Sequence, residues 1–148
     1  MSAQPVPLAP ALPEKVVIVL AAGLDLGQAA NATACLAAGL AAPGAAWAGQ
    51  PLRDADGMAS AAISHLPIIV LTAAEPRMAQ LRERLSLPMP DNAGMTLFPA
   101  YARQIHEAAE YWARHRRTSH RDQPLLGVGL AGPRRWVNAL TGSLPMLR

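Results

Sequence analysis

The chain has 148 residues, of which 51% are apolar, and a formal net charge of +3. Its length suits one domain with a hydrophobic core. No apolar run approaches the roughly 20 residues that a membrane helix needs, so we expect no membrane partner. The single cysteine, Cys35, excludes an internal disulfide, and such sparse cysteine usage suits a reducing, cytoplasmic location.

The first predicted elements are a lead-in, a strand and a helix. Residues 1–13 carry four prolines and no basic segment, which argues against a signal peptide and predicts a mobile, extended lead-in. The β-branched run at residues 15–20 predicts a strand that is covered on both faces. A turn at residues 23–27 leads into an alanine-rich helix over residues 28–40. We expect Cys35 in this helix to be a small buried residue rather than a reactive thiol, because no cation is adjacent in the sequence.

The middle of the chain predicts a loop, a strand and a second helix. Two prolines and three glycines in residues 41–57 indicate a loop, which Trp47 anchors to the core. Residues 65–72 form the second predicted strand, with Pro67 at its start or on an edge because proline donates no ladder hydrogen bond. A helix over residues 75–85 follows. Its inner face carries Met78, Leu81 and Leu85.

A second pair of elements follows a turn at residues 86–94. Residues 95–99 predict a short third strand, and residues 100–117 predict one continuous amphipathic helix. The apolar stripe of that helix consists of Tyr101, Ile105, Ala108, Ala109 and Trp112. Strands that alternate with helices in this way indicate an α/β domain with a mixed, mainly parallel sheet.

The C-terminal region predicts a buried strand, a short helix and an apolar tail. Residues 125–131 alternate glycine with larger apolar residues, which indicates close packing over one face of the strand. Residues 133–140 predict the last helix, which begins with proline. Gly142 stands where a left-handed residue commonly ends a helix. With Thr141, it is expected to fix the turn that docks residues 144–147 against the body.

Both ends of the chain carry recognisable motifs. Residues 126–133 read Leu-Gly-Val-Gly-Leu-Ala-Gly-Pro and residues 141–147 read Thr-Gly-Ser-Leu-Pro-Met-Leu, while Lys15 opens the first strand. These segments resemble the type-2 peptidyl-tRNA hydrolases, and Ile-Ser-His-Leu-Pro-Ile at residues 63–68 resembles an uncharacterised branch of that superfamily. The resemblance implies a single domain over residues 14–148, with a four-stranded mixed sheet and helices on both faces.

The resemblance also implies an active-site role for Lys15. A lysine there would stabilise a developing oxyanion or a phosphate; the alternative is a solubilising charge at a strand end. Two lysines of the family's first helix are replaced by Gln28 and Ala30, and its glutamine and histidine by alanines. The remaining polar residues, Gln28 and Asn31, either bind a ligand or cap the helix.

The family's third-strand motif, Asp-Ala-Gly-x-Thr, is nearest to Asn-Ala-Gly-Met-Thr at residues 92–96. In one alignment Asn92 replaces the acid and Thr96 is retained, so both occupy catalytic positions. In the other, residues 95–99 are the third strand itself and the place of the acid falls near Ala100 and Tyr101. Neither alignment supplies a carboxylate, and an amide cannot act as a general base.

Other polar residues give weaker signals. Ser64 and His65 lie just before the second strand, where they either contact a ligand at the strand's entry or make structural hydrogen bonds. Histidine, cysteine, aspartate and glutamate show no metal-ligand spacing, so we expect neither a metal nor a cofactor. The basic residues 114–121, with a second basic pair at residues 134–135, either meet a polyanion such as tRNA or form a solvated helix end.

Two functions are therefore open. The first is binding of a small molecule or partner in the ancestral cleft, around Lys15, Gln28, Asn31 and Ser64, with the hydrolase residues largely replaced. The second is metal-free hydrolysis of the ester bond in peptidyl-tRNA, with Lys15 polarising the ester and Thr96 positioning water. The resemblance also implies a homodimer, for which an apolar patch at the last helix and the tail is the expected surface.

Overall fold

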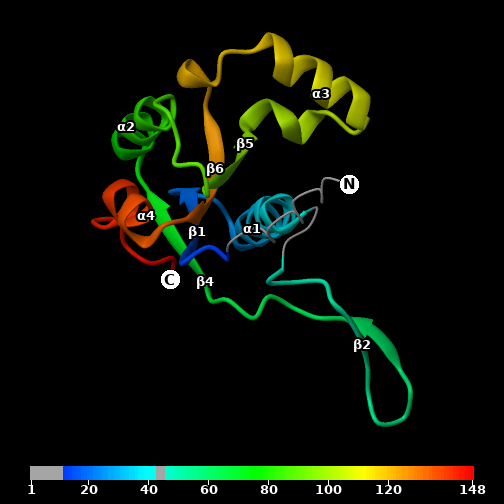
Figure 1. Cartoon of the computed structure of the whole chain (residues 1–148). Helices are drawn as coiled ribbons and strands as arrows, with labels where there is room; N and C mark the ends of the chain where they lie inside the picture. The colour runs from blue at the N-terminus through cyan, green and yellow to red at the C-terminus, as the bar shows by residue number, and fades with distance from the viewer. Residues whose placement is uncertain (1–11, 43–45) are drawn as a thin grey trace, which may run out of the picture.

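Four strands form the central sheet (Figure 1). The computed structural model describes residues 12–42 and 46–148, so the lead-in predicted for residues 1–13 lies almost wholly outside the described residues. The strands lie in the order β4 (Ile68–Ala73), β1 (Lys15–Ala21), β6 (Leu125–Gly132) and β5 (Gly94–Pro99). The predicted single-domain α/β fold with a four-stranded mixed sheet is confirmed.

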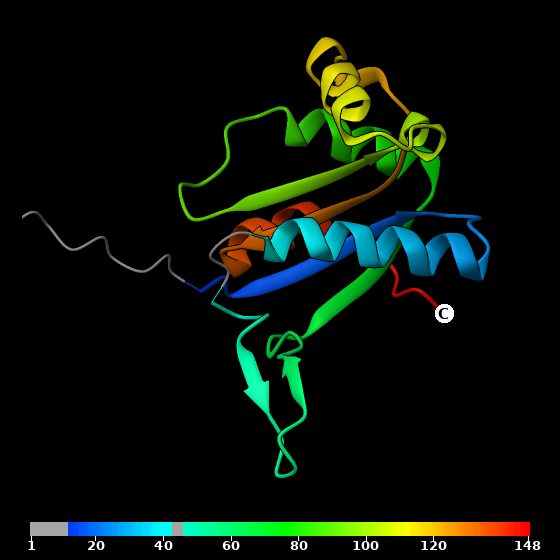
Figure 2. The same ribbon diagram turned by 90° about the vertical axis from the view of Figure 1, so that its right-hand side faces the viewer.

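Parallel pairing is confined to β1 and β4, whereas the sequence favoured a mainly parallel sheet. β6 runs antiparallel to both of its neighbours, β1 and β5. A parallel pair needs a connection that crosses a face of the sheet, usually a helix. The segment between β5 and β6 contains helix α3 (Ala108–Arg117), which lies beyond the β5 edge and not over a face (Figure 2). The chain therefore turns back and enters β6 antiparallel to β5.

Helices cover both faces of the sheet. Helix α1 (Leu26–Ala41) lies on one face, and helices α2 (Glu75–Leu85) and α4 (Arg134–Thr141) lie on the other (Figure 2). Strand β1 is buried on both faces, as its β-branched sequence predicts. Ile18 and Leu20 point towards α1, whereas Val17 and Val19 join the core beneath α2 and α4.

Glycines let α1 approach the sheet closely. A Cβ atom added at Gly127 would lie 2.8 Å from Cδ1 of Leu36, and one added at Gly129 would lie 2.8 Å from Cδ1 of Leu40. Gly39 on α1 is similar, because an added Cβ atom there would lie 2.8 Å from Cγ2 of Thr96. The predicted close packing over one face of the last strand is thus confirmed, and the partner is α1.

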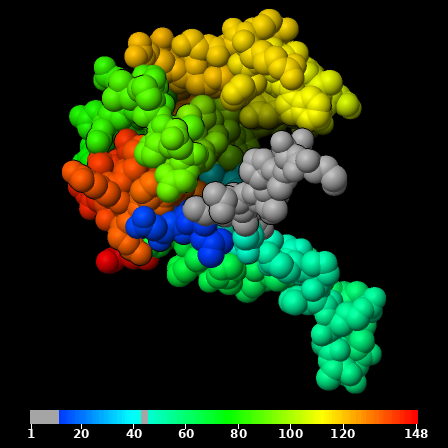
Figure 3. Space-filling view, viewed as in Figure 1, coloured from blue at the N-terminus to red at the C-terminus, as the bar shows by residue number. Residues whose placement is uncertain are grey.

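The loop predicted at residues 41–57 is only partly a loop. Strands β2 (Pro51–Arg53) and β3 (Ala59–Ala61) form a fully exposed hairpin, with Gly57 at a φ of +86° in its turn. The hairpin stands away from the body of the molecule (Figure 3). It was missed because each strand is only three residues long, too short for an apolar and polar pattern to stand out. Trp47 is 4% exposed, which confirms it as the anchor at the base of this segment.

The continuous helix predicted at residues 100–117 is wrong. A short 3-10 helix, η1 (Ala100–Gln104), is followed by extended backbone from Ile105 to Glu107, and α3 begins only at Ala108. Tertiary contacts override the helical pattern here. Tyr101 is buried against the segment that precedes β6, and the Ala100 N–H donates to the Pro124 carbonyl at 2.9 Å. Trp112 of the expected buried stripe is 55% exposed.

The C-terminal tail docks along the free edge of β4. The Thr72 N–H donates to the Pro145 carbonyl at 2.9 Å, and the Leu147 N–H donates to the Val70 carbonyl at 3.0 Å. The predicted docking is confirmed, but the expected left-handed conformation of Gly142 is wrong, since its φ is −61°. Glycine is needed there for space, because a Cβ atom would lie 2.7 Å from the Asn138 carbonyl oxygen.

Candidate functional site

A cavity of about 410 Å³ lies where α1, the edge strand β5 and the segment from η1 to α3 meet. The three residues at the break in the predicted long helix, 105–107, all line it. The cavity is lined by Cys35, Leu36, Gly39, Thr96, Leu97, Phe98, Ala102, Ile105, His106, Glu107, Ala108 and Tyr111. Most of these side chains are apolar, and the polar ones come mainly from α3 and the segment before it.

The polar lining combines a thiol, an imidazole, a carboxylate and a phenol. Cys35 is exposed, which corrects the expectation that it is buried, and its Sγ donates to Oδ1 of Asn31 at 3.9 Å. An alanine-rich helix has little contrast between its faces, so the sequence does not reveal which face is outward. Burial, and secondarily the neighbouring Tyr101, raises the pKa of the Tyr111 phenol. Tyr111 therefore stays protonated at neutral pH and can donate a hydrogen bond.

Thr96 is the one predicted catalytic residue that lines this cavity. Its Oγ1 donates to the Leu36 carbonyl of α1 at 3.0 Å, so this hydroxyl has no second proton to donate to a ligand. Lys15 lies at the start of β1, where its Nζ donates to Oδ1 of Asn138 on α4 at 2.7 Å. Helices α1 and α4 cover opposite faces of the sheet, so the structure does not bring Lys15 and Thr96 together. Asn92 is exposed in the turn before β5.

The residues predicted to bind a ligand are dispersed. Gln28 closes a capping box: its N–H donates to Asp25 Oδ1 at 2.8 Å, and its Oε1 accepts from the Asp25 N–H at 3.2 Å. This cap lies beyond the C-terminal end of β1, roughly 20 Å of strand away from Lys15. Ser64 Oγ donates to the Leu66 carbonyl at 2.7 Å. The exposed His65 donates its backbone N–H to the Trp47 carbonyl at 3.0 Å.

Sequence reasoning missed His106, Glu107 and Tyr111 as a group. The sequence pattern placed all three on one continuous helix over residues 100–117. None of them belongs to the apolar stripe that was expected to face the core. No glycine or proline marks the break at residues 105–107, so the sequence carries no local signal for this part of the lining.

Two stacked histidines attach α3 to η2 (His120–Asp122). The rings of His115 and His120 lie 4.1 Å apart between centroids, and Tyr101 Oη lies 2.6 Å from His120 Nε2. Burial, and secondarily the charge of His115, lowers the pKa of His120. His120 is therefore neutral at pH 7 and shares a hydrogen bond with the Tyr101 hydroxyl. Arg114, in the basic run, lies 4.3 Å from the centre of the Tyr101 ring.

One comparison decides the relationship of the chain to known proteins. A family described as "Protein of unknown function (DUF2000)" matches residues 14–148. The chain belongs to the DUF2000 family. This confirms the expected membership of a family of unknown function, while the link to the peptidyl-tRNA hydrolases stays a prediction.

The DUF2000 fold also occurs in a solved structure, that of the protein of unknown function Atu0240 from Agrobacterium tumefaciens strain C58. The two proteins are 21% identical and superpose with a TM-score of 0.76, over 90% of this chain and 97% of the other. At this identity the likeness establishes the fold alone. No curated protein matches the chain. In the part of the chain that the structure describes, every helix is too short or too polar to cross a membrane.

Proposed function

We propose that this DUF2000 protein binds a small, mainly apolar molecule with a hydrogen-bonding end in the cavity between α1, β5 and α3. The cavity itself carries the proposal. Its volume of about 410 Å³ falls within the range of roughly 300–1,000 Å³ that is usual for small-molecule sites. An apolar interior with a few polar groups is also the usual composition of such sites.

The apolar and polar residues of the lining indicate where the body and the hydrogen-bonding end of the ligand would lie. Leu36, Phe98 and Ile105 offer apolar surface to the body of the ligand. The phenol of Tyr111 and the imidazole of His106 offer hydrogen bonds to a hydroxyl or carbonyl group. The Thr96 hydroxyl donates its hydrogen bond to the Leu36 carbonyl of α1, so it can only accept a hydrogen bond from a ligand.

Two adjacent alanines on α3 allow a matched test. Ala108 lines the cavity and Ala109 does not, although both side chains are exposed. We expect Ala108→Trp to fill the cavity and weaken binding of the probe 2-naphthol about tenfold or more, equivalent to about 1.4 kcal/mol. Ala109→Trp should bind like the wild type. Titrations followed by backbone amide chemical shifts measure both, and equal affinity in the two variants would overturn the proposal.

Hydrolysis of peptidyl-tRNA is the alternative, and it rests on the resemblance of both chain ends. It has less support, because Lys15 and Thr96 lie on opposite faces of the sheet and cannot both reach one ester bond. Release of free tRNA from an N-blocked aminoacyl-tRNA tests it, with Lys15→Ala as the comparison. Turnover that collapses in the variant would establish the hydrolase. Release at the buffer rate by folded wild-type protein would exclude it for this substrate.

A further inference from the structure

A second cavity, of about 370 Å³, lies on the opposite face of the sheet. Helix α2, the turn at η2 and strands β5 and β6 enclose it. It is lined by Arg82, Leu85, Ser86, Met95, Leu97, Ser119, His120, Arg121 and Leu125. The floor is apolar because Met95 and Leu97 are the β5 residues that point away from α1. The polar part of the lining consists of arginine, histidine and serine side chains and contains no carboxylate, which distinguishes this cavity from the first.

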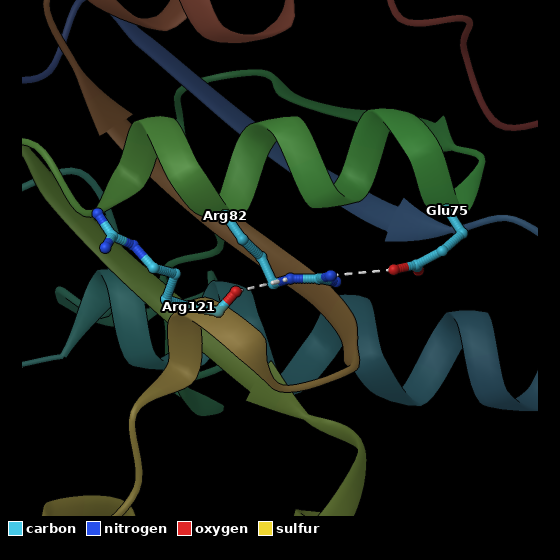
Figure 4. A network of polar contacts seen from close by, with 3 residues as sticks. All are labelled: Glu75, Arg82 and Arg121. Atoms are coloured by element: carbon cyan, nitrogen blue, oxygen red, sulfur yellow. Dashed lines mark hydrogen bonds and ion pairs between the residues drawn. The ribbon is translucent and has the colours of Figure 1, made fainter.

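Arg82 places a largely buried positive charge at this cavity. Its side chain is only 11% exposed, and its Nη2 pairs with Oε1 of Glu75 at 3.0 Å. Its Nε donates to the Arg121 carbonyl at 3.3 Å (Figure 4). Its third nitrogen, Nη1, is buried without a hydrogen-bond partner in the described part of the chain. A buried donor that lacks a partner is unfavourable, so the charge of this guanidinium is incompletely matched within the described residues and favours an anion close by.

Arg121 is the accessible charge of the same cavity. Its side chain is exposed, and its Nη2 donates to Oγ of Ser86 at 3.0 Å. Figure 4 shows that the guanidinium groups of Arg82 and Arg121 point in opposite directions from their backbone contact. An incoming oxyanion would therefore meet Arg121, with Ser119 nearby. The Ser86 hydroxyl donates to the Glu83 carbonyl at 2.6 Å, so its role is to position the Arg121 guanidinium. Arg82 adds a positive field from below, which its partner Glu75 only partly offsets, because that carboxylate is 68% exposed.

We propose that this cavity is a binding site for a ligand that carries one oxyanion, a carboxylate or a phosphate monoester, on a small apolar body. Arginine is well suited to both groups, because its planar N–H donors match two oxygens at once. The apolar floor of Leu85, Met95 and Leu97 takes the body of the ligand. The two cavities lie on opposite sides of the edge strand β5 and share one lining residue, Leu97; the polar groups of the two sites are different.

The test uses the full chain and three probes: inorganic phosphate, phenyl phosphate and benzoate. Each is titrated at constant ionic strength, with chloride as the balancing anion, and followed by backbone amide chemical shifts of residues 82–86 and 119–125. Arg121→Gln should weaken binding about tenfold or more, because it removes a charge-assisted hydrogen bond. Arg135→Gln is the matched control. It removes the same charge from an exposed residue on α4, which follows the far end of β6.

The probes separate the two sources of the oxyanion. Binding of both phosphates without benzoate identifies a phosphate ligand. Binding of benzoate alone identifies a carboxylate. In either case the proposal requires that Arg121→Gln weakens binding and that Arg135→Gln does not. Saturable binding that is equal in both variants would overturn the proposal. So would the absence of saturable shifts with every probe in the folded wild type. Ala108→Trp should leave this binding unchanged, which keeps the result separate from that of the first cavity.

Discussion

The two faces of the sheet are built differently, although the same strands supply both. On the α1 face, glycines and alanines allow a helix to lie almost on the backbone, and the cavity sits at the edge where that helix meets β5. On the other face, larger side chains such as Met78, Leu81 and Leu85 hold α2 farther out. Alternation along β5 sends Thr96 and Phe98 to the first cavity and Met95 to the second, while Leu97 lines both. A single edge strand thus serves two chemically distinct cavities.

The face that carries the larger side chains should be the more sensitive to truncation. Leu130 is fully buried in the core beneath α2 and α4. Leu130→Ala should lower the free energy of unfolding by about 2–5 kcal/mol, because it removes apolar contacts and leaves a cavity. Urea unfolding measures the change. A loss below about 1 kcal/mol would mean that this core relaxes around the gap.

The α1 face should instead be sensitive to enlargement. In Gly127→Ala the new methyl group would lie 2.8 Å from Leu36 Cδ1 and 2.9 Å from the Val19 carbonyl oxygen. That carbonyl belongs to the sheet and cannot move freely, so we expect a loss of about 1–3 kcal/mol in the free energy of unfolding. Gly94→Ala is the matched control on β5, since nothing lies within 4 Å of its added Cβ atom. Equal effects of the two substitutions in urea unfolding would contradict the close packing of α1.

The smallest expected effect concerns pH and the contact between α3 and η2. Because the pKa of His120 is lowered in the folded protein, the unfolded state takes up a proton first as the pH falls below about 6.5. The free energy of unfolding should therefore decrease as the pH falls from about 6.5 through the folded pKa, and then stay low. His120→Gln should reduce this decrease. Urea unfolding at several pH values would contradict the expectation if the wild type and the variant showed the same slope.

The sheet was largely predictable from sequence, and the reasons are local. Residues 15–20 form a continuous β-branched run, and Gly127 and Gly129 alternate with larger residues, so both central strands carry their own signal. Helix α2 agrees with its prediction because proline near its start and apolar spacing along it indicate the same bounds. The order of the strands and their directions depend on contacts between distant segments, which is why the antiparallel pairing of β6 was not anticipated.

The candidate site was much less predictable. Its lining depends on the break at residues 105–107, which no glycine or proline marks, and on the outward turn of Cys35 in a helix of small residues. The residues that were predicted from family motifs, such as Lys15 and Thr96, lie on opposite faces of the sheet. Motifs indicated the fold because they mark strands, turns and helix ends, but they did not indicate which side chains meet.

The docked tail has a consequence for biosynthesis. Residues 145–147 occupy hydrogen-bonding positions on β4 that an exposed edge strand would offer to another chain. Both the tail and β6, which lies in the middle of the sheet, are translated after β1, β4 and β5. Until residues 125–147 leave the ribosome, β1 lacks one neighbour and β4 has an open edge. The nascent chain is therefore open to pairing with other chains at β4 until residues 125–147 emerge, and docking of residues 145–147 covers that edge.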